Sequence, residues 1–366
     1  MPVHIRLHPQ RARAIKCRFS LLPYSKQLWR GIFSHQFRLA LGFAFGYRKC
    51  DLGNSGFNRY FKKKKIMKIA VIDLGTNGFR LNIAETFEQG QYQIIHKESN
   101  ELKLAAEGIH RIGDAPFQRG VETLHLFSSV LKQHNVLKVK AFATAAVRLA
   151  ENGQHFMDTI KNETGIDIEL ITGAREAELI YKGMSMYLPN NIEPVLMIDV
   201  GGGSVEFIIG NGEKMLWAHS FNVGVAILKQ KFHKNDPITV DEIKDIEQFL
   251  DTETADFLQQ LAVFHLKTPV IACGTLDFMV KILKGGYDGN YCEIAKSQFD
   301  DFYKTLTFSS EKALLDMPDV PKDKIEMLAV SMVLMAWVMK KLDTPKLVAS
   351  ANSMKAGILY EMSLAH

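Results

Sequence analysis

The chain has 366 residues, more than one hydrophobic core usually organises, so we expect two domains. With 47% hydrophobic and 23% charged residues, its composition is ordinary for a globular protein, and no uncharged apolar run reaches the roughly 18 residues of a membrane span. Four cysteines are too few for a disulfide framework and lack metal-ligand spacing. They indicate a reducing compartment, so we expect a cytoplasmic protein. Because the sequence has no membrane span, we also expect no membrane partner.

The formal net charge of +5 averages two unlike parts of the chain. Residues 1–66 contain 15 of the 45 Lys and Arg residues and one of the 40 acidic residues, which leaves the remainder with a net charge of −9. We therefore expect no nucleic-acid partner. Residues 1–66 also lack a lasting amphipathic period, and we predict a disordered leader or a wrongly assigned start, with Met67 as the true start. An Arg-rich targeting peptide and a nucleic-acid-binding arm are the alternatives.

From Met67 onward the pattern predicts an α/β fold. Short apolar runs at 69–73 and 79–85 flank a Gly-Thr-Asn-Gly turn and predict two strands joined by a tight loop. Strand and helix patterns then alternate, as in α/β proteins, and we assign 67–190 to a first domain. Its further predicted elements are strands at 92–96, 138–143 and 166–171 and helices at 117–133, 155–163 and 175–187.

A second strand–loop–strand unit begins after a turn at 188–191. Apolar strands at 195–200 and 205–209 flank a Gly-Gly-Gly-Ser loop, which repeats the first arrangement and suggests two related halves. We place the domain boundary near 189–194 and assign 191–366 to a second domain. The rest of it is mainly helical, with helices predicted at 240–250, 254–261, 276–283, 297–305 and 324–342 and strands at 269–272 and 346–348.

The two glycine loops carry the residues that point to chemistry. Glycines let a backbone come close to phosphate, and amide groups with polar side chains supply hydrogen-bond donors. Asp73, at the end of the first strand, is placed to hold a cation against phosphate oxygens. Asp199 and Glu206 bracket the second loop as two carboxylates that face the same space. A plain β-turn is the alternative interpretation of the first loop.

The paired loops support a resemblance to a known superfamily. Asp-Leu-Gly-Thr-Asn at 73–77 and Asp-Val-Gly-Gly-Gly-Ser at 199–204 resemble the phosphate loops of the sugar kinase, heat-shock chaperone and actin superfamily. This implies two actin-like (ribonuclease H-like) domains with an interdomain cleft. Within the superfamily, segments 143–152, 172–179, 272–275 and 353–359 resemble the exopolyphosphatase and guanosine pentaphosphate phosphohydrolase (Ppx/GppA) family. The chain resembles a short form without the extra C-terminal helical domains of longer relatives.

The resemblance implies roles for individual residues. Glu176 corresponds to the general base that activates the attacking water, and Arg148 to a phosphate-binding arginine. Asp199 and Glu206 correspond to carboxylates near the attacked phosphorus, and Asp73 with Asp199 would hold Mg²⁺. The predicted phosphate-binding residues are Gly75, Thr76, Asn77, Gly78, Gly201, Gly202, Gly203 and Ser204. The alternatives are an exposed helix N-terminal acid for Glu176 and a solvated surface arginine for Arg148.

The implied function is a Mg²⁺-dependent phosphohydrolase that releases terminal phosphate from inorganic polyphosphate or pppGpp, acting as a homodimer. Two departures from the family pattern stand near the loops: Val205 replaces a threonine, and Arg175 replaces the first glutamate of an acidic pair. The segment 101–108 stands where an Arg-Leu-Gly stretch is usual, so one basic phosphate contact is either lost or moved to Lys103. Two other functions stay open: an actin-like ATP-dependent kinase or ATPase, which would share both loops, and a non-catalytic sensor of phosphate-rich ligands.

Overall fold

The computed structural model describes residues 65–186, 188 and 193–365, all within the compact unit Lys63–His366. The first described strand already begins at Lys65. The prediction of a disordered or wrongly assigned segment 1–66 otherwise lies outside the described residues and stays a prediction. The predicted domain boundary near 189–194 also falls mostly outside them.

The first sheet has five strands in the order β3-β2-β1-β4-β5. β1, β2 and β3 form an antiparallel meander, and β4 and β5 add to β1 in parallel. The predicted strand at 166–171 is real but shorter than expected, because only three of its residues pair with β4. The strands are β1 (Lys65–Leu74), β2 (Gly78–Phe87), β3 (Tyr92–Glu101), β4 (Lys138–Ala143) and β5 (Ile168–Leu170).

The second sheet has six strands in the order β10-β11-β9-β6-β7-β8. Read from β8, it repeats the first sheet: an antiparallel meander, then β9 and β11 in parallel, with β10 added antiparallel at the edge. The α/β fold with two actin-like sheets is therefore confirmed. The strands are β6 (Val195–Val200), β7 (Val205–Gly210), β8 (Met215–Phe221), β9 (Pro269–Ala272), β10 (Tyr291–Ala295) and β11 (Lys346–Ser350).

Helices cover both sheets and enclose two of the three hydrophobic clusters. α2 and α4 contribute Leu124, Phe127 and Phe156 to the cluster of the first sheet, and α12 contributes the fully buried Trp337 to that of the second. Among the described helices, none combines the length and apolarity needed to cross a bilayer. The helices are η2 (Glu88–Gly90), α2 (Asp114–Gln133), α3 (Ala145–Leu149), α4 (Gly153–Thr164), α5 (Gly173–Ser185), α6 (Val225–Phe232), α7 (Val240–Glu253), α8 (Ala255–Phe264), α9 (Gly274–Lys284), α10 (Lys296–Phe308), α11 (Glu311–Leu315), α12 (Ile325–Leu342) and α13 (Met354–Leu364).

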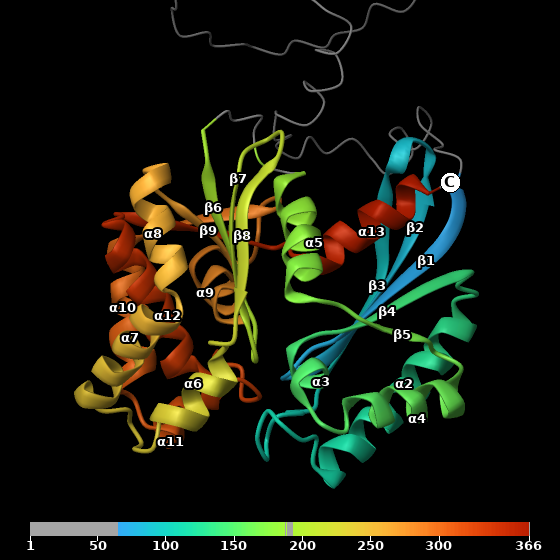
Figure 1. The fold of residues 1–366 in the computed structure, drawn as a ribbon, viewed down its shortest axis with the longest axis horizontal. Coiled ribbons are helices and arrows are strands. Elements are labelled where there is room, and N and C mark those ends of the chain that lie inside the picture. Colours follow the sequence, from blue (N-terminus) through green and yellow to red (C-terminus); the bar gives the residue numbers. More distant parts are fainter. Residues whose placement is uncertain (1–64, 187, 189–192, 366) are drawn as a thin grey trace, which may run out of the picture. The chain divides into compact units, whose positions relative to one another are not determined.

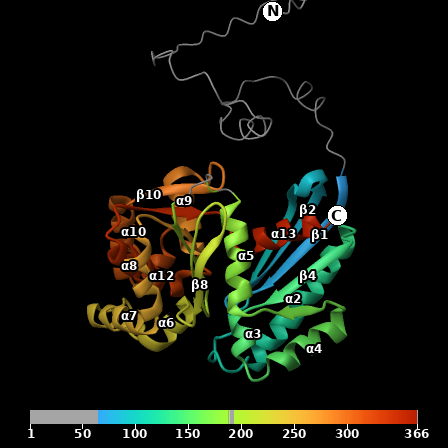
Figure 2. The same ribbon diagram turned by 45° about the horizontal axis from the view of Figure 1, so that its top comes forward.

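Two helices connect the two sheets. α5 follows the first sheet in the chain but packs against β7 and β8 of the second, whereas the C-terminal α13 returns to β1 and β2 (Figures 1 and 2). The two helices also pack against each other. Together they bury a third hydrophobic cluster that contains Val71 of β1, Met197 of β6, Ile180 of α5 and Ile358 of α13. Both sheets therefore contribute to one shared cluster in addition to their own.

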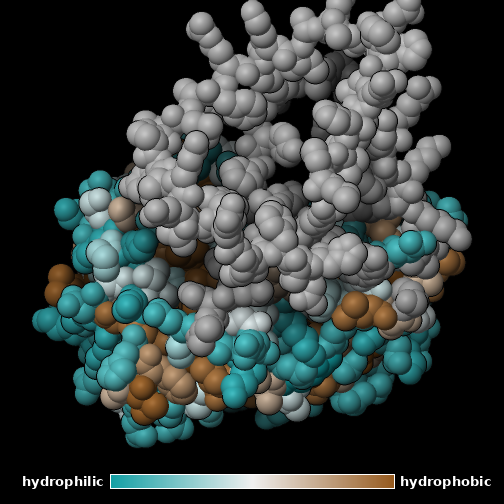
Figure 3. All heavy atoms as spheres, turned by 90° about the horizontal axis from the view of Figure 1, so that it is seen from above, coloured by the Kyte–Doolittle hydropathy of each residue, from teal (hydrophilic) through white to brown (hydrophobic). Residues whose placement is uncertain are grey.

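Large exposed hydrophobic side chains are spread over several elements. Leu126, Val240, Val263 and Phe308 come from four different helices. On the face seen in Figure 3, hydrophilic residues cover most of the visible described surface, and hydrophobic ones lie between them in small groups. Single exposed apolar residues are ordinary on folded proteins and do not identify an interface. The expected homodimer therefore stays a prediction.

The crossing of α5 and α13 depends on two glycines. A Cβ on Gly357 would overlap the Leu179 carbonyl oxygen, and one on Gly183 would overlap that of Ser353. We expect Gly357→Ala to force the helices apart and lower the free energy of unfolding by about 1–3 kcal/mol, measured by urea denaturation. Gln259→Ala, at an exposed position of α8, is the control and should change stability by less than about 0.5 kcal/mol. Equal stability of the two variants would contradict the tight crossing.

Candidate functional site

The two glycine loops line one cavity of about 480 Å³. Asp73 near the end of β1 and Asp199 near the end of β6 both face it. The structure thus brings together nearly all residues that the sequence predicted for the site. Those that line the cavity are Asp73, Gly75, Thr76, Asn77, Glu176, Asp199, Gly201, Gly202, Gly203, Ser204 and Glu206. Gly78 and Arg148 are not among the lining residues.

The two loops touch each other at this cavity. A Cβ on Gly202 would lie 2.8 Å from Asn77 Oδ1, and one on Gly203 would lie 2.8 Å from Thr76 Oγ1. Such distances are too short for a real carbon atom, so a side chain at either position would have to displace Asn77 or Thr76 of the first loop. The sequence attributed these glycines to close approach of a ligand. The structure adds a second reason, which is the approach of the first loop.

Backbone hydrogen bonds from the segment after β3 hold the first loop in place. The amides of Leu102 and Lys103 donate to the Asn77 carbonyl at 2.8 and 2.9 Å, and the amide of Leu104 donates to the Thr76 carbonyl at 2.9 Å. Lys103 adopts a left-handed conformation with φ of 51°. Its ammonium lies 2.8 Å from Glu326 Oε1 across the cavity wall, so the candidate phosphate contact at this position is engaged by a carboxylate.

Glu176 lies in the first turn of α5. The Thr172 hydroxyl caps this helix by accepting from the Arg175 amide at 3.2 Å, which satisfies an amide at the start of the helix. Glu176 is only 7% exposed, so its interpretation as an exposed helix N-terminal acid is wrong. Burial raises the pKa of Glu176, the nearby charge of Glu206 raises it further, and Arg148 opposes both effects. A carboxyl in this environment is a strong base once it has lost its proton.

Arg148, at the end of the short α3, positions Glu176. Its Nη1 lies 3.3 Å from Glu176 Oε2 and donates to the Ile171 carbonyl at 2.8 Å. The guanidinium side chain is 21% exposed and its partner is buried, so the interpretation of Arg148 as a solvated surface arginine is wrong. Its role as a phosphate-binding residue stays a prediction.

Glu206 stands opposite Asp199 in the β6–β7 ladder, and Ser220 of β8 donates to its Oε1 at 2.7 Å. The residue is 2% exposed, and burial together with the charge of Asp199 raises its pKa. Burial likewise raises the pKa of Asp199. The Ser353 hydrogen bond and the charge of Lys355 lower that pKa, and the charge of Asp73 raises it. The cavity therefore concentrates acids that repel one another.

The predicted magnesium site would draw on few protein ligands. Among the described residues, no group of three or more His, Cys, Asp or Glu is arranged to hold a metal. Mg²⁺ is nevertheless commonly held by one or two carboxylates, water and substrate phosphates, which demands less of the protein. Asp73 and Asp199 supply two hard oxygen donors in one cavity. They fit Mg²⁺ that is shared with a bound phosphate.

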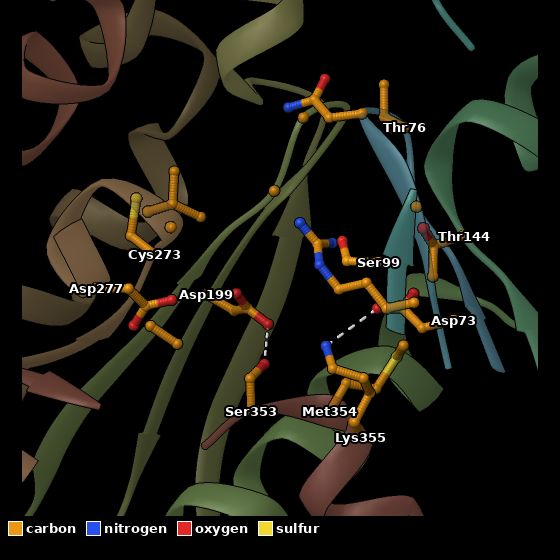
Figure 4. Close-up of a pocket in the computed structure, with 18 of the residues that line it drawn as sticks. Asp73, Thr76, Ser99, Thr144, Asp199, Cys273, Asp277, Ser353, Met354 and Lys355 are labelled. Carbon is orange, nitrogen blue, oxygen red and sulfur yellow. Dashed lines mark hydrogen bonds and ion pairs between the residues drawn. The ribbon is translucent and has the colours of Figure 1, made fainter. Parts of the chain in front are cut away.

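Sequence reasoning missed several polar residues that line the cavity. Ser353 and Lys355 reach it from the first residues of the α13 segment, and Figure 4 shows them directed at Asp199 and Asp73. Both belong to the segment that supported the family resemblance, but no role was inferred for them. Arg80 lies directly opposite Asp73 in the β1–β2 ladder, so strand pairing was the signal that could have identified it.

The chain is similar to known proteins over most of its length. The model of the Ppx/GppA phosphatase family matches residues 83–366. The solved exopolyphosphatase from Cytophaga hutchinsonii is 31% identical, with a TM-score of 0.77 over 81% of this chain and 98% of that one. The Ppx/GppA family member from Aquifex aeolicus is 24% identical, with a TM-score of 0.67 over 82% of this chain and 98% of its own, and shows the same fold.

A curated relative is the guanosine-5'-triphosphate,3'-diphosphate pyrophosphatase of Photobacterium profundum, which is 24% identical over 296 residues. The match covers 80% of this chain but only 59% of the relative, so the chain spans less than two thirds of that protein's length. The family model covers well over half of the chain, including the second glycine loop. The chain belongs to the Ppx/GppA phosphatase family.

Proposed function

We propose that this chain is a Mg²⁺-dependent phosphohydrolase that releases terminal phosphate from polyphosphate or pppGpp. The observation that carries the proposal is the convergence of two glycine loops and the buried acids Glu176 and Glu206 on one cavity. The names of two relatives, an exopolyphosphatase and a guanosine-5'-triphosphate,3'-diphosphate pyrophosphatase, support the two substrate classes.

The loops would bind and orient the phosphate to be removed. Thr76, Asn77 and Ser204 line the cavity with polar side chains, and backbone amides of glycine-rich loops bind phosphate oxygens well. Asp73 and Asp199 would hold Mg²⁺, whose positive charge would offset the negative charge of the phosphate and so favour attack by water. Phosphoryl transfer needs mainly positioning and charge neutralisation, which this set of groups supplies.

Glu176 would accept the proton of the attacking water. A general base works best when its pKa lies near the working pH, and burial moves the pKa of Glu176 upward in that direction. Arg148, 3.3 Å from Glu176 Oε2, would stabilise the ionised form and fix the carboxylate in place. Because the base form increases as pH rises through a raised pKa, the rate should rise on the alkaline side of neutrality.

We expect Glu176→Gln to reduce phosphate release by roughly 10²–10⁴-fold while substrate binding changes little, because the amide keeps the shape but accepts no proton. The measurement is phosphate release from polyphosphate, pppGpp and ATP, each with and without Mg²⁺. Glu213→Gln, at an exposed position after β7, is the control and should have wild-type turnover.

Several results would count against these assignments. Near-normal turnover of Glu176→Gln would remove Glu176 from the role of base. ATP as the sole substrate, or transfer to an acceptor, would favour a kinase or ATPase. Tight binding without release by the wild-type protein would favour a sensor of phosphate-rich ligands.

The raised pKa of Glu176 also makes a prediction for stability. Because the fold favours the protonated carboxyl, the unfolded chain holds fewer protons, and stability falls as pH rises from about 4.3 toward the folded pKa. Glu176→Gln removes this penalty. We expect its Tm in EDTA to exceed that of the wild type by at least about 2 °C at pH 8, with a smaller difference at pH 5. A difference that does not grow with pH would show that Glu176 is not penalised by burial.

A further inference from the structure

One turn of the C-terminal helix touches both candidate metal-binding acids. The Ser353 hydroxyl donates to Asp199 Oδ2, and the Lys355 ammonium lies 3.2 Å from Asp73 Oδ2 (Figure 4). The two aspartates belong to different sheets, because Asp73 lies in β1 and Asp199 in β6. Residues two positions apart in the chain thus reach carboxylates that are 126 positions apart.

These two acids need a positive charge between them. Asp73 is 7% exposed and lines the same cavity as Asp199, and one turn of a single helix contacts both carboxylates. Buried like charges destabilise a fold unless a cation compensates them. Among the residues that the structure describes, Lys355 is the one basic residue within 4.0 Å of Asp73. Four other basic residues line the cavity. Lys103 pairs with Glu326 at 2.8 Å and Arg80 lies 3.9 Å from Glu101, whereas Lys97 and Lys324 form no ion pair with Asp73.

The Lys355 side chain is suited to a reversible contact. Its side chain is 25% exposed, so water reaches it, and its flexible four-carbon stem allows the ammonium to move within the cavity that it lines. Lysine also binds phosphate as a point charge without fixed geometry. An ammonium released from Asp73 would therefore stay next to a bound phosphate rather than lose its partner.

We propose that Lys355 is a positioning residue that substitutes for the metal: its ammonium neutralises Asp73 while the cavity holds no cation and moves to substrate phosphate when Mg²⁺ takes that carboxylate. The inference rests on the proposed function, because it assigns Mg²⁺ to Asp73 and Asp199. It explains why the acids from both sheets are held by one helix. Mg²⁺ and the Lys355–Asp73 ion pair are then mutually exclusive.

The first test is a double-mutant cycle on the full chain in EDTA, with Tm as the readout. Lys355→Met leaves Asp73 uncompensated and should lower Tm, and adding Asp73→Asn should recover most of that loss. Lys182→Met is the matched control, because Lys182 of α5 pairs at 2.7 Å with Glu361 of α13, the helix that carries Lys355, and does not line the cavity. Its loss of Tm should not be recovered by Asp73→Asn. Additive effects of Lys355→Met and Asp73→Asn would overturn the inference.

The second test is calorimetric Mg²⁺ binding without substrate. We expect Lys355→Met to bind Mg²⁺ at least about fivefold more tightly than the wild type, because the metal no longer displaces an ammonium. Lys355→Arg, which keeps the charge, and Lys182→Met should bind Mg²⁺ as the wild type does. Equal or weaker Mg²⁺ binding by Lys355→Met would overturn the inference.

A parallel assay separates this inference from the proposed function. If wild-type protein releases phosphate only with Mg²⁺ while Lys355→Met shows unchanged Mg²⁺ affinity, the function stands and the role of Lys355 is refuted. If the wild type releases no phosphate at any Mg²⁺ concentration, the proposed function fails. The affinity difference between Lys355→Met and Lys355→Arg then still decides whether lysine and metal compete for Asp73.

Discussion

Confinement of several like-charged carboxylates in one cavity is the constraint on which this structure depends. Asp73, Glu176, Asp199 and Glu206 all line it, and burial raises the pKa of the last three. Repulsion among them opposes the approach of the two sheets. The opposing force comes from the shared hydrophobic cluster, in which Val71 and Met197 from the two sheets are fully buried with α5 and α13. Apolar packing therefore sustains an arrangement that electrostatics alone would separate.

The two halves use the same scaffold for different charges. In the first hairpin, Asp73 stands opposite Arg80, whereas in the second, Asp199 stands opposite Glu206. The repeated strand order puts the two pairs at equivalent places in their sheets. The first hairpin thus carries one basic and one acidic side chain at this place, and the second hairpin carries two acidic side chains. A phosphate that must be held and also attacked needs both kinds of group, and divergence of two equivalent positions supplies them without a change of fold.

The sequence predicted what depends on local patterns. Apolar runs interrupted by glycine located both hairpins and put Asp73 and Asp199 at the ends of their strands, whereas the meeting of the two acids in one cavity was implied only by the family resemblance. β8 and β10 were not predicted; both are outer strands in which most residues are exposed or half-buried. The burial of Glu176 also could not be predicted from the residues next to it in the sequence. Its spacing is typical of an exposed N-terminal acid, and only packing of α5 against the second sheet buries it.

Contacts between segments far apart in the chain account for the other features of the site that the sequence did not predict. The side chains of Ser353 and Lys355 reach the cavity because α13 returns to the first sheet. This return depends on the topology of the whole chain and cannot be predicted from neighbouring residues. The same applies to Gly202 and Gly203, whose small size is required by Asn77 and Thr76 on the other loop. A glycine-rich motif therefore encodes two requirements at once. Its amides suit a phosphate, and its missing side chains let the opposite loop close the cavity in which that phosphate would be held.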